Sequence, residues 1–282
     1  MLIMSNMKKK YTVSSFANKV MARIEFFFAR PKLNLFKTLY LNLRCLPLLQ
    51  ALRFPVHVYG ALKIYSLEGA IEIEGPIRCG MIKIGLPGVS PGTSTLRKYL
   101  KLDGKIIFKG DINFFNGCSI CVARGAVLSF GRETWIGDKA IIHCTKRIEL
   151  GDCFHSATGL YMIDTNGHYI LDIENKSIGS IAGNIFIGEY VWLGNNVSVS
   201  KSTILPAHTI VANRSLVNRD YTKSVPEYSI IAGSPAKLVK TGFTRIYNPH
   251  NEKMLNEWFD VNGENSVFHC EANNIKEFCY GV

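Results

Sequence analysis

The sequence predicts an all-β architecture, a parallel β-helix, and two periodic patterns support this prediction. Near Ile185 the chain begins to divide into hexads, NIFIGE, YVWLGN, NVSVSK, STILPA, HTIVAN and RSLVNR. One apolar residue recurs at every sixth position: Ile187, Leu193, Val199, Leu205, Val211 and Val217. Medium to small residues precede these by two positions: Ile185, Val191, Val197, Thr203, Thr209 and Ser215. A period of six fits neither a helix nor a single strand, and is typical of short strands that form the sides of a prism.

The same period, with slips, extends the predicted β-helix toward the amino terminus. It links Phe108, Phe114 and Ile120, then Phe130, Ile136, Ile142 and Ile148, and then Leu150, Ser156 and Met162. We attribute the slips to loops that leave the corners of the prism. We therefore expect a basic, amphipathic helical arm over 1–58, the β-helix over 59–240 with a loop at 163–184, and a tail over 241–282, where NEKMLNEWF predicts a short helix.

The positive charge of the chain is concentrated at its amino terminus. Up to Pro55 there are ten Lys or Arg residues and one acid, so this part carries +9 of the total charge of +11. Leu and Phe are interleaved with the basic residues, which favours contact with an anionic membrane; a solvated helical face is the alternative, and no nucleic-acid motif occurs. No apolar run reaches the about 20 residues of a membrane span, and no signal-peptide pattern is present. With eight cysteines, we expect reduced thiols in a cytoplasmic protein.

Three motifs in this order resemble those of the hexapeptide-repeat acyltransferases. The hexads are similar to the [LIV]-G-x-x-[small]-x repeat, VWLGNN is similar to V-W-I-G, and IIAGSPAKLVK is similar to the terminal signature I-x-G-x-P-[AC]-[KR]-x-[IV]. The resemblance covers roughly residues 105–240 and implies a left-handed β-helix, acetyl-CoA as acyl donor and a homotrimer with its sites between neighbouring subunits. Similar amino-terminal arms occur in polysaccharide O-acetyltransferases of this family.

The stretch YMIDTNGHYIL, residues 161–171, interrupts the hexads and contains the candidate catalytic histidine. The segment that follows resembles the loop of galactoside and maltose acetyltransferases, which places His168 on their catalytic histidine. A sugar hydroxyl needs a proton acceptor when it attacks a thioester, and imidazole serves this purpose at neutral pH. Asp164 is the candidate that orients the ring, with Asp172 as competitor and loop capping as the structural alternative for both.

The remaining candidate residues belong to acceptor or donor binding. For the acceptor we assign Asn166, His143, His155 and Trp192, although a structural histidine is the simpler interpretation of His143 and His155. For coenzyme A the resemblance implies Asn195, Asn213, Asn218, Arg219, Lys237 and Lys240; the last two replace arginines of the family. We expect His208 to face solvent at a corner. Cys118 and Cys121 form a C-x-x-C without a second pair, so we expect no metal site.

These observations predict an acetyl-CoA-dependent O-acetyltransferase that modifies a sugar hydroxyl of a surface polysaccharide or its precursor, with His168 as general base. An N-acetyltransferase acting on an amino-sugar nucleotide is one alternative. A catalytically silent β-helix used as a scaffold is the other. The expected partners are a carbohydrate acceptor, two further copies of the chain and an anionic membrane that the arm contacts peripherally.

Overall fold

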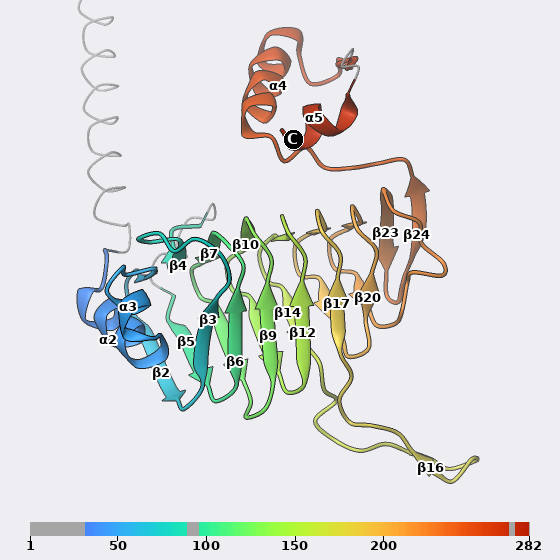
Figure 1. Ribbon diagram of the computed structural model, residues 1–282. Helices are drawn as coiled ribbons and strands as arrows, with labels where there is room; N and C mark the ends of the chain where they lie inside the picture. The colour runs from blue at the N-terminus through green and yellow to red at the C-terminus, as the bar shows by residue number, and fades with distance from the viewer. Residues whose placement is uncertain (1–31, 89–95, 271–273, 282) are drawn as a thin grey trace, which may run out of the picture.

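The chain winds into a three-sided, left-handed parallel β-helix, which confirms the predicted fold class (Figure 1). The computed structural model describes residues 32–88, 96–270 and 274–281. Three parallel sheets form the faces of the prism, and every third strand along the chain pairs with the strand one coil earlier. Within the described residues no helix is both long and apolar enough to cross a bilayer.

The first face comprises β1 (Val56–Val58), β4 (Ile82–Leu86), β7 (Ile112–Phe115), β10 (Thr134–Ile136), β13 (His155–Ser156), β18 (Trp192–Leu193), β21 (Ile210–Val211), β23 (Ser229–Gly233) and β24 (Ala236–Thr241). The second face comprises β2 (Leu62–Leu67), β5 (Lys98–Leu102), β8 (Ser119–Val122), β11 (Ile141–Cys144), β14 (Tyr161–Ile163), β19 (Ser198–Val199) and β22 (Leu216–Val217). The third face comprises β3 (Ala70–Ile73), β6 (Lys105–Phe108), β9 (Val127–Phe130), β12 (Arg147–Leu150), β17 (Ile185–Ile187) and β20 (Ile204–Leu205).

The strand register explains both the hexads and their slips. Leu193 pairs with Val211, a step of 18 residues, so three hexads complete one coil. Ile136 pairs with Phe114, a step of 22 residues, because the earlier coils carry extra residues at their corners. All the apolar positions identified from the period of six point inward and are buried, as are the smaller residues that precede them. Stacked coils thus form one continuous core along the axis of the prism.

Residues in left-handed backbone conformation turn two of the corners. Between the third and first faces they are Glu133, Cys153, Tyr190, His208 and Tyr228, with φ between 54° and 60°. Between the first and second faces, Lys139, Asn196 and Arg214 adopt φ near 60° and Gly159 adopts 81°. A positive φ is costly for a residue with a Cβ. At the corner between the third and first faces, the repeated geometry stacks the rings of Tyr190, His208 and Tyr228 above one another.

A short helical cap covers the first coil. It consists of α2 (Leu35–Cys45), which begins at the capping side chain of Asn34, and α3 (Leu48–Ala51). Asn42 exchanges two hydrogen bonds with the backbone of Val56, and the Thr38 hydroxyl accepts one from the Val58 N–H. The cap thereby satisfies backbone groups at the edge of β1, which would otherwise be open for pairing.

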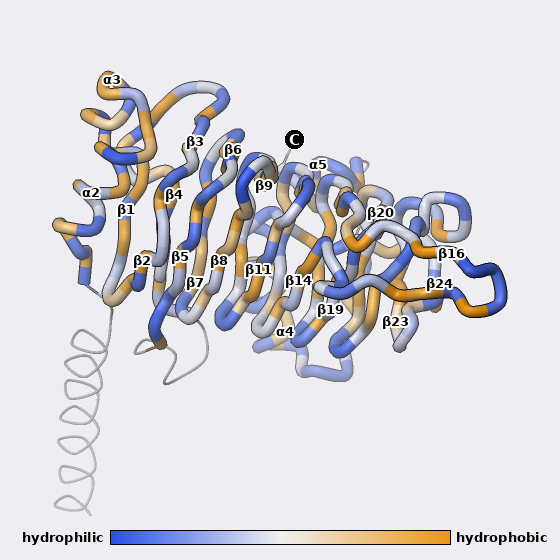
Figure 2. Tube along the Cα trace, turned by 90° about the horizontal axis from the view of Figure 1, so that it is seen from below, coloured by the Kyte–Doolittle hydropathy of each residue, from blue (hydrophilic) through white to orange (hydrophobic). Residues whose placement is uncertain are grey.

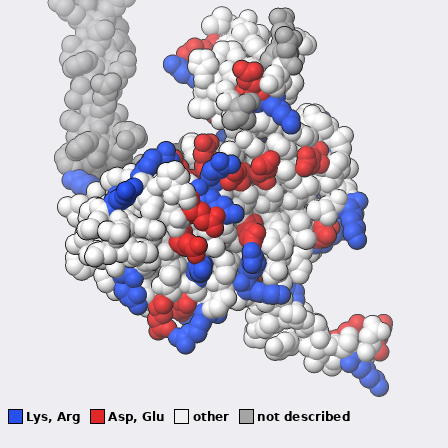
Figure 3. All heavy atoms as spheres, viewed as in Figure 1, with Lys and Arg blue, Asp and Glu red and all other residues white. Residues whose placement is uncertain are grey.

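Three further features complete the molecule. Strand β24 runs antiparallel to β23 and ends the first face. A hairpin of β15 (Leu171–Asp172) and β16 (Ser177–Ile178) projects from the body (Figure 1), and α4 (Pro249–Asn262) and α5 (Ile275–Tyr280) form a carboxyl-terminal segment. Acidic and basic groups are interspersed over the third face (Figure 3), where Lys105 pairs with Glu72 and Arg124 with Glu68.

Candidate functional site

The root of the projecting hairpin is a buried carboxylate. Asp164 directly follows β14 and is fully buried. Its side chain accepts hydrogen bonds from the Thr145 N–H and hydroxyl, both at 2.7 Å, and from the N–H groups of Lys146 and Arg147 at 2.7 and 3.1 Å. These donors lie one coil earlier, so Asp164 fastens the start of the hairpin to the preceding turn of the β-helix.

His168 lies beyond this root, on the exposed part of the hairpin. Among the described residues it forms no hydrogen bond with Asp164, whose four donors come from elsewhere. Asp172 is also engaged, because its carboxylate accepts from the N–H and side-chain amide of Asn175. Neither of the two expected carboxylates is therefore paired with His168 in the described part of the chain. Asn166, whose N–H donates to Ile181 O at 2.9 Å, holds the two arms of the loop together just before His168.

The hairpin exposes an unusual amount of apolar surface for a loop. Five large apolar side chains on it are between 54% and 82% exposed: Tyr169, Ile170, Leu171, Ile173 and Ile178. Figure 2 shows this segment as alternating hydrophobic and hydrophilic stretches that extend away from the coils. Exposed apolar groups concentrated in one projecting element are typical of an interaction surface.

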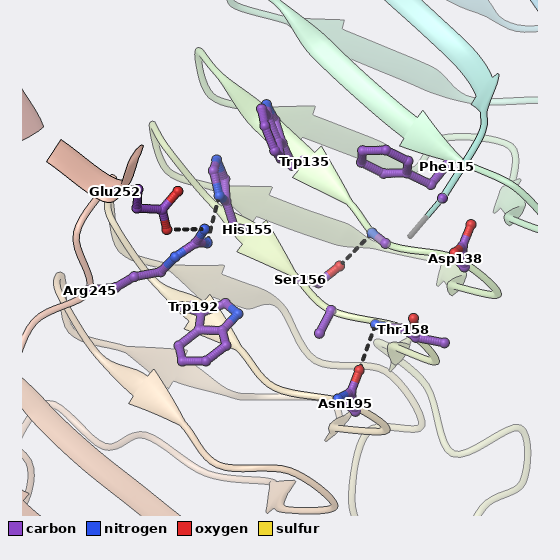
Figure 4. Close-up of a pocket in the computed structure, with 13 residues that line it drawn as sticks. Phe115, Trp135, Asp138, His155, Ser156, Thr158, Trp192, Asn195, Arg245 and Glu252 are labelled. Atoms are coloured by element: carbon purple, nitrogen blue, oxygen red, sulfur yellow. Dashed lines mark hydrogen bonds and ion pairs between the residues drawn. The ribbon is translucent and has the colours of Figure 1, made fainter. Parts of the chain in front are cut away.

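A cavity of about 690 Å³ lies on the first face of the prism, away from the hairpin. Trp192 of β18 lines it together with Trp135, His155 and Phe115 from the preceding coils (Figure 4). The indole of Trp135 stacks on the ring of His155, with centroids 4.8 Å apart. The predicted acceptor residues are thus divided: Trp192 and His155 line this cavity, whereas His143 lies on the second face, where its carbonyl accepts from the N–H of Asp164.

Both ring nitrogens of His155 are occupied by protein groups. Nδ1 lies 2.8 Å from Nη1 of Arg245, and Nε2 lies 3.2 Å from the carbonyl oxygen of Glu133. Arg245 can only donate, so Nδ1 accepts and the proton resides on Nε2. Burial, with the Arg245 charge, lowers the pKa of His155 to about 3, which keeps the ring neutral. His155 therefore positions Arg245 and has no nitrogen left for a sugar hydroxyl.

The carboxyl-terminal segment packs on the corner between the third and first faces. The rings of Tyr190, His208 and Tyr228 stack there, and the Tyr280 hydroxyl lies 2.8 Å from Nδ1 of His208. His208 is only 7% exposed, so the expectation that it faces solvent is wrong. The reason is that Tyr247 and Tyr280 of the carboxyl-terminal segment cover this corner, which the hexad pattern does not reveal.

The candidate coenzyme A residues follow the corner between the first and second faces. Asn195 lines the cavity, and its Oδ1 accepts from the Thr158 N–H. One coil later, Oδ1 of Asn213 accepts from the Asn195 N–H at 2.8 Å. A second hollow of about 430 Å³ continues from Thr158 and Asn195 to Asn213 and Arg214. The cavity and this hollow share Thr158 and Asn195, so they form one path along the corner.

The remaining donor candidates lie at the carboxyl-terminal end of the coils. Arg219 and its neighbour Asn218 follow β22, and Arg219 Nη2 donates to Ala236 O at 3.3 Å, beside Lys237. Lys237 pairs with Ala232 toward the end of β23, whereas Lys240 pairs with Ile230 near its start. Arg219 and Lys237 are thus brought close through the β23–β24 hairpin, not by stacking of regular 18-residue coils. Lys240 instead places its ammonium group 5.4 Å from the centre of the Phe243 ring.

In the C-x-x-C motif Cys118 is buried and Cys121 is half-buried. Cys118 is buried, and burial raises its pKa to about 12, so its thiol stays protonated. In the described parts of the chain no three His, Cys, Asp or Glu side chains are grouped closely enough to hold a metal ion.

Sequence reasoning missed the residues that the carboxyl-terminal segment adds to the cavity, chiefly Arg245 and Glu252. One signal was available: ring side chains at positions 190, 208 and 228 recur at the coil period of 18 to 20 residues. Aromatic residues at successive left-handed corners predict a stacked ladder, and a second element is needed to cover it.

Comparison with known proteins agrees with the resemblance seen in the sequence. Polysialic acid O-acetyltransferase of Escherichia coli O1:K1 / APEC is 31% identical over 142 residues, which span 50% of this chain and 43% of that protein. The putative lipopolysaccharide biosynthesis O-acetyl transferase WbbJ of E. coli K12 is 29% identical over 153 residues, 50% of this chain and 74% of that protein. The chain thus spans less than half the length of the first relative. The structure of the polysialic acid-specific acetyltransferase NeuO matches with a TM-score of 0.42 and 21% identity, over 72% of this chain and 98% of that one. No protein-family model matches.

Proposed function

We propose that this protein is an O-acetyltransferase that moves an acetyl group from acetyl-CoA to a sugar hydroxyl of a surface polysaccharide or its precursor. The observation that carries the proposal is His168, exposed on a hairpin that a buried Asp164 fastens to the coil. The sequence similarity to polysialic acid O-acetyltransferase and to a putative lipopolysaccharide biosynthesis O-acetyl transferase supports this choice of acceptor class.

The active site is proposed to be composite, formed between neighbouring copies in a homotrimer. In a single chain His168 and the Trp192 cavity belong to different parts of the prism, and no contact joins them among the described residues. The exposed apolar side chains of the hairpin, such as Ile173 at 82%, would become buried against a neighbour. A hairpin that inserts toward the adjacent first face would bring His168 to the Trp192 cavity.

In this arrangement the chemistry is a single acyl transfer. The hydroxyl oxygen attacks the thioester carbonyl, its proton passes to the imidazole of His168, and coenzyme A leaves as a thiolate that recovers the proton. Asp164 acts as a positioning residue, because it fixes the root of the hairpin. The corner path along Asn195 and Asn213 would hold the extended donor, with Lys237 and Arg219 at its far end near the phosphates.

The test is acetyl transfer from labelled acetyl-CoA to a panel of cell-envelope oligosaccharides. His168→Ala should lower kcat by about 10²–10⁴-fold, the usual loss when a general base is removed, with unchanged oligomeric state. His269→Ala is the matched control, an exposed histidine near the carboxyl terminus. Turnover of the His168 variant within a few-fold of the parent would refute the assignment.

We further propose a cytoplasmic location with peripheral contact between the helical cap and an anionic membrane. The outer sides of α2 and α3 expose Phe36, Leu48 and Leu49 by 64–81%. Lys37 and Arg44 flank them, and no acid occurs between Glu25 and Glu68. Apolar groups flanked by cations fit a surface of anionic lipids.

A further inference from the structure

Arg245 is the cationic side chain that enters the Trp192 cavity from the carboxyl-terminal segment (Figure 4). Its guanidinium lies 5.4 Å from the ring centre of Trp192 and 4.9 Å from that of Tyr247. The neutral ring of His155 accepts one of its hydrogen bonds at 2.8 Å. Two aromatic rings and a histidine thus fix the orientation of a cation that is 24% exposed.

Most of the hydrogen-bonding capacity of this guanidinium remains available to the cavity. A guanidinium has five N–H donors, and within the described residues only the bond to His155 uses one. Glu252 is the nearest carboxylate, at 3.6 Å, which is an ion pair but too long for a hydrogen bond. The Glu252 side chain is 50% exposed and can turn toward solvent.

A fixed, partly desolvated guanidinium with free parallel donors is suited to a planar or tetrahedral anion. We infer that Arg245 binds a carboxylate or phosphate group of the acceptor sugar in the Trp192 cavity, and that Glu252 occupies this position when the cavity is empty. The inference rests on the proposed function in one respect, because it takes the bound anion to be part of the acceptor sugar. It adds a substrate class, acidic or phosphorylated sugars, and a residue that selects it.

Binding can be measured on the full chain without turnover. Two of the three tryptophans line the cavity, so ligand binding should change the intrinsic fluorescence. The probes are methyl glucuronide, which has a carboxylate, glucose 1-phosphate, and methyl glucoside as the neutral match. We expect the two anionic probes to bind about ten- to hundredfold more tightly than methyl glucoside, the range for a charge-assisted pair.

The variants separate anion binding from a structural role. Arg245→Gln should abolish the preference for anionic probes, and Arg245→Lys should keep only part of it. Glu252→Gln should increase the preference, because the competing carboxylate is gone; a purely structural contact would not produce a gain. Arg124→Gln is the matched control at the corner between the second and third faces, where Arg124 is 82% exposed and pairs with Glu68. This control should match the parent.

Two results would overturn the inference. One is equal affinity of the parent for methyl glucuronide, glucose 1-phosphate and methyl glucoside. The other is a loss of coenzyme A affinity in Arg245→Gln with unchanged sugar preference, which would assign Arg245 to the donor phosphates. Neither result depends on His168, so failure of acetyl transfer and failure of anion selection are distinguishable.

Discussion

Replacing Asp164 by Asn should loosen the root of the hairpin that carries His168, the proposed general base, although the new side chain has the same shape. The carboxylate accepts four hydrogen bonds, two from Thr145 and one each from the N–H groups of Lys146 and Arg147. An amide oxygen can keep the pair from Thr145. The amide NH₂ would then face the other two N–H groups, so donors would meet donors.

The expected cost follows from those two lost bonds. Each charge-assisted bond contributes about 1.5–3 kcal/mol, and a buried N–H left without an acceptor costs about 1–3 kcal/mol. Lys146 and Arg147, which donate the two lost bonds, are exposed residues, so their backbone can relax partly toward water. We therefore expect the free energy of unfolding to fall by only about 3 kcal/mol. For a domain of this size that corresponds to a Tm lower by roughly 6–12 °C. Displacement of His168 by about 1 Å would also lower kcat by up to about 10²-fold.

Thermal unfolding followed by circular dichroism and kcat for acetyl transfer, measured on the same samples, test this reasoning. Asp172→Asn is the matched control, since Asp172 is exposed on the hairpin and its carboxylate accepts hydrogen bonds from its near neighbours in the chain, Glu174 and Asn175. Its Tm should stay within about 2 °C of the parent. An Asp164→Asn variant with the parent Tm and a kcat reduced 10²-fold or more would show that Asp164 acts on His168 directly.

Four other perturbations have defined outcomes. Ile173→Asp places a charge on a hairpin side chain that is 82% exposed, so it should leave the single chain folded and shift the proposed trimer toward monomer in light scattering. Leu41→Ala, at a fully buried position under the cap, should lower the free energy of unfolding by about 2–5 kcal/mol in denaturant titrations. Phe36→Ser should weaken sedimentation with anionic liposomes but not acetyl transfer, and salt-insensitive sedimentation of the parent would refute the membrane contact. His155 has a folded-state pKa near 3, below its unfolded value near 6.5, so the unfolded chain takes up the proton first and stability falls as pH drops from about 6.5 toward 3. By pH 4 this amounts to about 3 kcal/mol, and a His155→Gln variant that keeps the full pH slope would contradict the assignment.

The β-helix could be predicted because its core repeats. Leu193 and Val211 occupy equivalent positions one coil apart, and both are buried. The short sequence period therefore predicts contacts between residues that are a whole coil apart, since each coil repeats the same contacts. The slips do not disturb the core, because the extra residues form loops at the corners and the apolar residues of each strand still point inward.

The site could be predicted only in part, for two physical reasons. Asp164 lies at the root of the histidine loop, but its hydrogen-bond donors come from residues 145–147, which no local sequence pattern links to it. Arg245 lies 90 residues after His155 in a segment without repeats. Contacts between a repetitive body and a non-repetitive tail have no period, so the sequence does not report them.

The strand pairing of the prism has a consequence for how its stability is distributed. Within the prism each coil pairs only with the coil before and the coil after it, as in a one-dimensional chain of nearest neighbours, and the carboxyl-terminal segment adds contacts to His155, Trp192 and His208. The free energy is then a sum over interfaces, and both ends can fray independently. Strands β13 and β18, which carry His155 and Trp192, are adjacent near the middle of the first face. Weakening that one interface would divide the molecule into two cooperative units, so denaturant unfolding of a variant altered there should change from one transition to two.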